Sequence, residues 1–273
     1  MKRKMYLVSL LVLLALVIAI PVQAITFGQP DGDGHPNVGM LWAELPSGLY
    51  GVCSGTLVPA ANRVKYDVFL TAAHCLAWAP EGTIWMVTFD SETVDYSQDP
   101  PEVIADFIIA KDAVFHPDYN HDMADLHDLG VVLLPNNSAK KIEPAEMPPL
   151  GLLDDMKAEG ALKGQEFVAV GYGATRLDKT GGFQPLFYED LRQFATGTFS
   201  SLTNSWLHIS MNPATDDGGT CYGDSGGPHF LGDSNLLVSI TVTGDSPCRA
   251  SDVTYRLDTE SAQSFLSTYI AFP

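Results

Sequence analysis

Basic residues are scarce in this sequence. Its 273 residues include 15 lysines and arginines against 33 aspartates and glutamates, a formal net charge of −18. Proteins bind nucleic acid largely through contacts between basic side chains and phosphates, so this charge argues against a nucleic-acid partner. An acidic chain stays soluble and attracts cations, and a solvated acidic surface is the simplest explanation of the charge.

Long apolar runs are absent except at the N-terminus. Three basic residues at 2–4 precede an apolar stretch over 5–20, and the residues Val-Gln-Ala at 22–24 fit a small-residue cleavage site. The run is shorter than the ~20 residues that usually span a bilayer, which favours a cleaved signal peptide over 1–24 rather than an uncleaved anchor. We therefore expect a secreted mature chain, 25–273, without stable membrane association; loss of three basic residues gives it a charge of −18 − 3 = −21.

Cysteines are few, and none belongs to a C-x-x-C pair, so the sequence gives no support to a cysteine-based metal site. Four cysteines in an exported chain predict two disulfides, and sequence alone allows three pairings. Repeats and low-complexity tracts are also lacking after the first residues. With 46% hydrophobic and 18% charged residues, the chain is expected to fold as one compact unit or as two small similar units.

The most informative stretch, residues 220–228, has the sequence TCYGDSGGP. A serine hydroxyl becomes an effective nucleophile only with a base to take its proton and fixed donors to hold the oxyanion. Glycines on both sides of Ser225 permit unusual φ values, so that backbone N–H groups can converge near the hydroxyl. A bare Gly-x-Ser-x-Gly is more often a tight turn, but the whole of 223–228 after a cysteine is far more specific.

Two further motifs supply partners for Ser225. The sequence TAAHC at 71–75 contains His74, whose imidazole titrates near physiological pH, as a general base requires. Asp128 opens the apolar segment DLGV and suits the aspartate that orients such an imidazole. Asp122 and Asp125 are rivals, but no comparable apolar segment directly follows them, so we expect them to be exposed loop carboxylates.

Together these motifs resemble the chymotrypsin-like (trypsin-fold, S1 family) serine proteases. The order His74, Asp128, Ser225 agrees with this family and differs from the orders in subtilisin and the α/β-hydrolases. The resemblance implies an all-β fold of two antiparallel six-stranded β-barrels with the triad in the cleft between them. It places the barrels at approximately 25–135 and 165–257.

The residue pattern agrees with an all-β fold, because many short strands separated by turns favour barrels or a sandwich over βαβ units. The strand candidates lie at 38–45, 49–58, 67–70, 83–89, 103–109, 113–115, 129–134, 166–172, 187–200, 206–211, 236–242 and 255–257. The stretch 136–164 is expected to be a connector. A C-terminal helix is expected over 258–270, capped by Asp258 or Thr259, with one apolar face.

The resemblance also implies a mechanism for a protein or peptide substrate that needs no cofactor. Ser225 would attack the carbonyl, His74 would take its proton, Asp128 would orient His74, and the amides of Gly223 and Ser225 would form the oxyanion hole. A monomer is expected. The disulfides implied are Cys53–Cys75 and Cys221–Cys248.

The resemblance has a consequence for activation as well. Enzymes of this family are usually activated when a cut frees an Ile or Val terminus, whose ammonium pairs with the aspartate before the nucleophile. Here those residues would be Ile25 and Asp224, so that signal cleavage itself would activate the chain. Thr26 and Phe27 depart from the family's usual pattern.

The expected substrate-pocket residues are Gly219, Thr220, Gly244 and either Val253 or Asp252. In trypsin-like enzymes the pocket base lies six residues before the nucleophile, and Gly219 here is not an aspartate, which argues against strict cleavage after Arg or Lys. Val253 would give a shallow apolar pocket, whereas Asp252 could restore a basic preference; the apolar interpretation is slightly favoured. Val242 and Thr243 stand where the family usually has Ser and Trp.

Four other interpretations have less support. Asp31 and Asp33 could contact calcium, although a surface turn is the better prediction. A metal site formed by His121, Asp122, Asp125 and His127 is a minor alternative. A catalytically silent homologue acting as a binding module would usually have lost a triad residue. A serine esterase of another fold would need a helix after Ser225, where the sequence instead predicts loop and strand.

Overall fold

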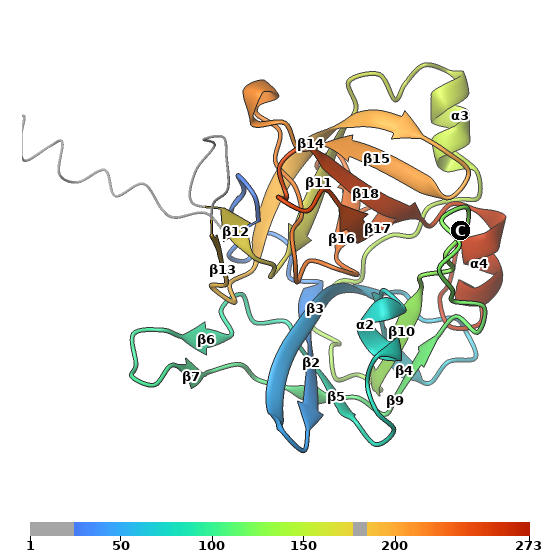
Figure 1. Cartoon of the computed structure of the whole chain (residues 1–273). Helices are drawn as coiled ribbons and strands as arrows, with labels where there is room; N and C mark the ends of the chain where they lie inside the picture. The colour runs from blue at the N-terminus through green and yellow to red at the C-terminus, as the bar shows by residue number, and fades with distance from the viewer. Residues whose placement is uncertain (1–24, 177–184) are drawn as a thin grey trace, which may run out of the picture.

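The computed structural model describes residues 25–176 and 185–273, so the expected signal peptide at 1–24 lies outside the described residues. Two seven-stranded sheets form two bodies that lie against one another (Figure 1). Within the described ranges, the helices are all too short or too polar to cross a membrane.

The first sheet is entirely antiparallel, in the order β8-β5-β2-β3-β4-β10-β9. Its strands are β2 (Val38–Leu45), β3 (Gly48–Val58), β4 (Tyr66–Thr71), β5 (Ile84–Thr88), β8 (Ile108–Ile109), β9 (Asp112–Phe115) and β10 (Gly130–Pro135). β10 is a continuous apolar run because it lies inside the sheet, between β4 and β9, where nearly every residue is buried. Gly48, at φ +141°, allows the tight β2–β3 turn.

This first sheet differs from the expected six-stranded barrel, because its ladder stays open. Of the two strands expected at 103–109 and 113–115, the first keeps only Ile108–Ile109 in this sheet, as β8, and the second is present as β9; Ala110 and Lys111 join them. The Ala110 amide donates to the Trp85 carbonyl on β5, and the Lys111 amide donates to the Leu133 carbonyl on β10. The kinked segment 108–115 therefore bridges the two sides of the curled sheet without a continuous ladder.

The second sheet closes into the expected six-stranded barrel, because β14 pairs with both β11 and β15. Its strands are β11 (Glu166–Gly171), β14 (Gln193–Leu202), β15 (Trp206–Ser210), β16 (Pro228–Leu231), β17 (Leu237–Gly244) and β18 (Ser251–Arg256). The short strand β1 (Gln29–Pro30) adds to β14 as a seventh. The N-terminal segment thus begins on the second barrel and then crosses to the first.

Two small hairpins lie outside the barrels. They are β6 (Val94–Asp95) with β7 (Glu102–Val103), and β12 (Thr175–Arg176) with β13 (Leu186–Phe187). In Figure 1 the β6–β7 arm projects away from the first sheet, below β12 and β13.

The expected connector 136–164 contains a helix that the sequence did not predict, α3 (Leu152–Ala158). It follows Gly151, which has positive φ and cannot cap the helix with a side chain. Its first turn is instead bound by Asp258, whose carboxylate accepts a hydrogen bond from the Leu153 amide at 2.8 Å. A capping group 105 residues away in sequence leaves no local signal.

The expected C-terminal helix is confirmed as α4 (Glu260–Leu266), shorter than predicted. Thr259 is its N-cap, accepting a hydrogen bond from the Ala262 amide. A third helix, α2 (His74–Ala77), and a 3₁₀ turn, η1 (Pro213–Thr215), complete the elements. Leu266 is fully buried, so α4 packs its apolar face into the core.

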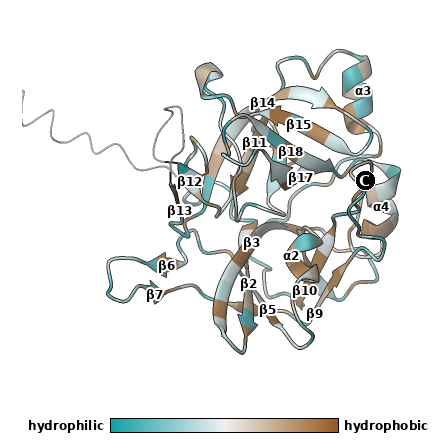
Figure 2. Ribbon diagram, in the orientation of Figure 1, coloured by the Kyte–Doolittle hydropathy of each residue, from teal (hydrophilic) through white to brown (hydrophobic). Residues whose placement is uncertain are grey.

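One cluster of buried apolar side chains runs through both bodies and holds them together. Phe69 and Val132 contribute from the first sheet, and Phe230 and Ile240 from the second, all fully buried. Hydrophobic segments accordingly follow the strands in Figure 2, with hydrophilic ones toward the loops. Both predicted disulfides are present, Cys53–Cys75 in the first body and Cys221–Cys248 in the second.

Asp31, expected in a surface turn or as a calcium ligand, is instead buried in a hydrogen-bonded cluster. Its carboxylate accepts bonds from Arg192 Nε at 2.8 Å and from the His35 amide at 2.9 Å. Arg192 also donates to the carbonyls of Val38 and Phe89 on the first body. Burial raises the pKa of Asp31, but the bonds from His35 and Arg192 outweigh it and hold the pKa below the usual value.

Replacement Arg192→Met should lower the free energy of unfolding by about 3–5 kcal/mol, because it leaves Asp31 buried without its cation. The double variant Arg192→Met/Asp31→Asn should recover part of the loss. Urea unfolding at neutral pH measures both, with exposed Arg63→Met as the matched control. A loss for Arg192→Met no larger than that for Arg63→Met would contradict the expectation.

Candidate active site

His74 and Asp128 are brought together by the first sheet. Gly130 on β10 lies opposite Thr71 on β4, which places the residues just before β10 beside the turn that follows β4. A Cβ at position 130 would lie 2.9 Å from the Ala72 carbonyl oxygen, so only glycine permits this approach. In the sequence Asp128-Leu129-Gly130, the glycine is therefore required by close packing, whereas the aspartate supplies the carboxylate.

The Asp128 carboxylate holds His74 through two contacts, one with its backbone amide and one with its ring. Oδ1 accepts a hydrogen bond from the His74 amide at 2.8 Å, and Oδ2 lies 2.7 Å from Nδ1. The Asp128 side chain is 2% exposed and that of His74 is 31% exposed. An Nδ1–H that donates to this carboxylate leaves Nε2 as the proton acceptor, which is the arrangement a general base needs.

Ser225 lies on a loop of the second body that contacts the first body next to His74. Its carbonyl oxygen accepts a hydrogen bond from the Ser54 amide at 2.9 Å and lies 3.7 Å from Sγ of Cys75. The Ser54 hydroxyl donates to the Gly223 carbonyl at 3.1 Å. The loop is thus held at both ends of the Gly-Asp-Ser sequence. Between described residues, no hydrogen bond joins His74 to Ser225, and such bonds often form only with substrate.

The amides around Ser225 divide into two sets. The Asp224 amide donates to the Cys221 carbonyl, and the amides at 226 and 227 donate to Thr241 and Asp224. By contrast, the amides of Gly223 and Ser225 donate to no protein group among the described residues. Gly223 has φ +101°, which L side chains rarely adopt. Two free amides beside a serine hydroxyl can bind a developing oxyanion.

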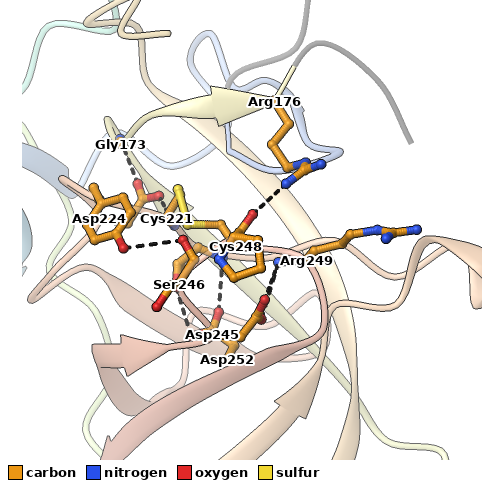
Figure 3. Close-up of a disulfide and its surroundings, with 12 residues drawn as sticks. Gly173, Arg176, Cys221, Asp224, Asp245, Ser246, Cys248, Arg249 and Asp252 are labelled. Carbon is orange, nitrogen blue, oxygen red and sulfur yellow. Dashed lines mark hydrogen bonds between the residues drawn. A yellow bond between two sulfur atoms is a disulfide. The ribbon is translucent and has the colours of Figure 1, made fainter. Parts of the chain in front are cut away.

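Asp224 is fully buried under this loop. Its carboxylate accepts hydrogen bonds from the amides of Gly173 at 2.7 Å and Cys221 at 2.9 Å, as Figure 3 shows. A Cβ on Gly171 or Gly173 would lie within about 2.3 Å of an Asp224 oxygen, so both glycines make room for the carboxylate. Burial raises the pKa of Asp224 to about 7, because these two amides only partly offset desolvation.

The N-terminal segment reaches the same region. Ile25 is fully buried, and Thr26 forms an isolated bridge with Gly219, whose amide donates to the Thr26 carbonyl at 3.1 Å. In this form of the chain residue 24 is still attached to Ile25, so no free ammonium is present. The segment nevertheless already lies beside Gly219, in the stretch that leads to the nucleophile loop.

A pocket of about 200 Å³ opens beside Ser225. Of the expected residues, Thr220 and Gly244 line it, whereas the described lining does not include Gly219, Asp252 or Val253. Its walls are Thr220, Cys221, Tyr222, Ser225, Thr241, Val242, Thr243, Gly244, Asp245, Ser246 and Cys248. Cys221 and Cys248 both line the pocket, and they are joined as a disulfide, which Figure 3 shows.

Two positions where the chain departs from the family pattern lie between this pocket and His74. Val242 and Thr243 line both the pocket and a second groove, of about 290 Å³, that includes His74 and Asp128. With valine at 242, that position offers no hydroxyl to Asp128. The hydrogen bonds of the Asp128 carboxylate accordingly come from His74 alone among the described residues.

The described residues do not bring together the alternative metal ligands that the sequence suggested. In the described chain, the only group of potential ligands close enough to share an ion is Cys53, His74 and Cys75, and its two cysteines are joined as a disulfide. Asp122 is an exposed loop residue, as expected. Asp125 is not: its side chain is 30% exposed, and its carboxylate accepts hydrogen bonds from Tyr255 and Ser261.

The esterase alternative fails on local structure, because Gly227 leads directly into strand β16 and not into a helix. Sequence reasoning also missed two residues near the site. Ser54 binds the nucleophile loop from the first body, and His229 lies buried behind the pocket. The role of Ser54 could have been suspected from its position immediately after Cys53. The sequence around His229 contains no comparable signal.

The comparisons with known proteins agree with this geometry. The family model described as Trypsin matches residues 44–263. Among solved structures, HL collagenase at 1.7 Å resolution superposes with a TM-score of 0.64 and 20% sequence identity, covering 89% of this chain and 97% of its own. At that identity the superposition shows the fold, which is the expected chymotrypsin type. The family match covers well over half of the sequence, and the chain therefore belongs to the trypsin family of serine proteases.

Proposed function

We propose that this chain is a secreted serine endopeptidase, with a signal peptide at 1–24 and a protease domain at 25–273, that acts as a monomer on protein or peptide substrates. The observation that carries the proposal is the pair of unpartnered amides, Gly223 and Ser225, beside a serine whose loop is bound next to an aspartate-oriented histidine.

In the proposed mechanism, Ser225 Oγ attacks the substrate carbonyl carbon while His74 Nε2 takes its proton. The carbonyl oxygen becomes an oxyanion held by the amides of Gly223 and Ser225. Asp128 keeps the ring in place and stabilises the imidazolium. His74 then protonates the leaving amine, and water repeats the cycle on the acyl-enzyme. The reaction needs no cofactor.

We infer that small or apolar residues are preferred before the scissile bond (P1). The pocket is small, at about 200 Å³. Gly219, six residues before Ser225 where the family places the pocket base, is not a carboxylate. The walls contributed by Thr220, Val242 and Gly244 carry no charge. Strict cleavage after Arg or Lys is therefore not expected.

We also infer that cleavage after Ala24 completes the active form. The new Ile25 ammonium would be placed beside Asp224, which is buried and in the uncut chain has only amide partners among described residues. A buried carboxylate without a cation is costly, so the pairing would stabilise the loop that carries Ser225.

A fluorophosphonate experiment tests the proposed function. The exported protein is measured by intact mass before and after treatment, its N-terminus is sequenced, and hydrolysis of an unstructured protein such as casein is followed. We expect one adduct on Ser225, an Ile25 terminus, and loss of hydrolysis on labelling. Protein that starts at Ile25 but neither labels nor hydrolyses would indicate a silent homologue that acts by binding.

A further inference from the structure

A buried histidine–aspartate contact lies behind the specificity pocket and takes no part in the proposed mechanism. His229 on β16 and Asp252 on β18 are each 1% exposed, and Nε2 of the histidine lies 3.1 Å from Oδ2 of the aspartate. Nδ1 of His229 has no hydrogen-bond partner among the described residues. A buried imidazole with one unpartnered nitrogen is unusual, because such groups are normally satisfied on both sides.

The Asp252 carboxylate is also bound by the wall of the pocket. The Thr220 amide donates to Oδ2 at 3.0 Å, and the Thr220 hydroxyl donates to Oδ1 at 2.7 Å. Oδ2 would lie 3.0 Å from a Cβ at Gly219. The carboxylate therefore stands directly behind Gly219 and Thr220, on the side away from the pocket space that Thr220 lines.

The donors around this carboxylate keep it ionised. Burial alone raises the pKa of Asp252, but the charge and hydrogen bond of His229, with the two bonds from Thr220, outweigh burial and lower it. Three donors occupy most of its acceptor positions. A cationic substrate side chain would have to displace one of them.

We propose that His229 is a specificity-determining residue: it holds the Asp252 carboxylate behind the pocket wall and so makes the pocket select uncharged P1 side chains. The inference rests on the proposed protease function and assigns its substrate class. Without His229, the charge behind Gly219 would be uncompensated in a site of low dielectric, where a Lys or Arg side chain entering the pocket would be its nearest available partner.

The other carboxylate at the pocket does not change this conclusion. Asp245 lines the pocket, but its Oδ1 accepts hydrogen bonds from the amides of Ala250 and Ser251 at 2.7 Å each, and the Arg249 amide lies at 3.1 Å from Oδ2. It thereby closes the loop 245–251. Both carboxylates nearest the pocket are thus engaged by the protein itself.

The test compares two matched peptides that differ only in having Leu or Lys at P1, using protein quantified by fluorophosphonate labelling of Ser225. We expect wild type to favour Leu in kcat/KM. His229→Leu should raise the Lys-to-Leu ratio by about tenfold or more, the effect of one charge-assisted hydrogen bond, mainly through a lower KM for Lys. His229→Gln, which keeps a donor near the carboxylate, should leave the ratio close to wild type.

The variant His229→Leu/Asp252→Asn should abolish the gain, because the freed charge is gone; a purely structural role of His229 would not produce this reversal. A labelled His229→Leu with an unchanged ratio would overturn the inference. If His229→Leu does not fold, the single variant Asp252→Asn is measured instead. If wild type prefers Lys and Asp252→Asn removes that preference, the inference is overturned. If wild type prefers Leu and Asp252→Asn leaves the Lys-to-Leu ratio within about threefold of wild type, the inference is supported. Wild-type protein with neither labelling nor cleavage would refute the protease function itself.

Discussion

Replacement Ser225→Ala is expected to lower kcat by about 10⁴- to 10⁶-fold, the range seen when a nucleophile is removed from such a triad. The variant should also lose fluorophosphonate labelling completely. Only the Oγ atom is deleted, and the backbone contacts of Ser225 with Ser54 remain. KM should change little, because the pocket walls are intact. Hydrolysis of the Leu peptide, normalised to total protein concentration, measures the effect.

Ser234→Ala is the matched control, because Ser234 is an exposed serine on the β16–β17 turn. It should retain full labelling and full rate. Residual labelling of Ser225→Ala at another serine, with hydrolysis retained, would show that a different residue is the nucleophile. Thermal unfolding of both variants within a few degrees of wild type would exclude loss of fold as the cause.

A chain that keeps residues ahead of Ile25 is expected to have kcat/KM lower than the Ile25 form by about two to three and a half orders of magnitude, the equivalent of losing one partner of a buried ion pair. The reason is that Asp224 then lacks its cation, and the loop that presents the Gly223 and Ser225 amides is less stable. Asp224→Asn in the Ile25 form should have a loss of the same order. Equal activity of the extended and Ile25 forms would contradict this account of activation.

The same pair predicts a difference in pH dependence of stability. In the extended chain the folded-state pKa of Asp224 is raised to about 7, above its value in the unfolded chain. The folded state then binds more protons than the unfolded state between these two pKa values, so stability falls as pH rises from about 4 to about 7. The proposed pairing with the Ile25 ammonium would lower the pKa of Asp224, so the Ile25 form should not lose this stability.

Melting temperatures of the two forms from pH 4 to pH 8 measure this difference. The gap between them should widen with pH in favour of the Ile25 form. Asp224→Asn in both forms should make the gap independent of pH, since the titrating group is gone. If the difference in melting temperature between the two unsubstituted forms is constant with pH, Asp224 does not interact with the Ile25 ammonium.

Much of the fold could be predicted because its signals are local. Strand β2 begins and ends at the residues predicted from its apolar segment and the turn residues that flank it. Helix α4 is capped by Thr259, the residue directly before its first turn. The features that were missed depend on distant partners. Helix α3 is capped by Asp258, and the first sheet stays open where Ala110 and Lys111 donate to carbonyls of β5 and β10.

The candidate site divides in the same way. The motifs around His74, Asp128 and Ser225 could be recognised in sequence, because each combines a reactive side chain with the small neighbours that its position requires. The environment of buried charges could not be predicted. Asp252 was a possible pocket residue by sequence, but which side of the pocket wall its carboxylate faces is decided by His229, 23 residues away on another strand.

The most direct test of the proposed catalytic mechanism is to trap the acyl-enzyme. The Ile25 form is mixed with a slowly deacylating nitrophenyl ester, quenched in acid within the first turnover, and mapped by peptide mass spectrometry. We predict a burst of nitrophenol equal to the enzyme concentration and an acyl group on Ser225, absent in Ser225→Ala. Turnover of the ester without a burst, or with the acyl group on another residue, would contradict the assignment of Ser225 as the nucleophile.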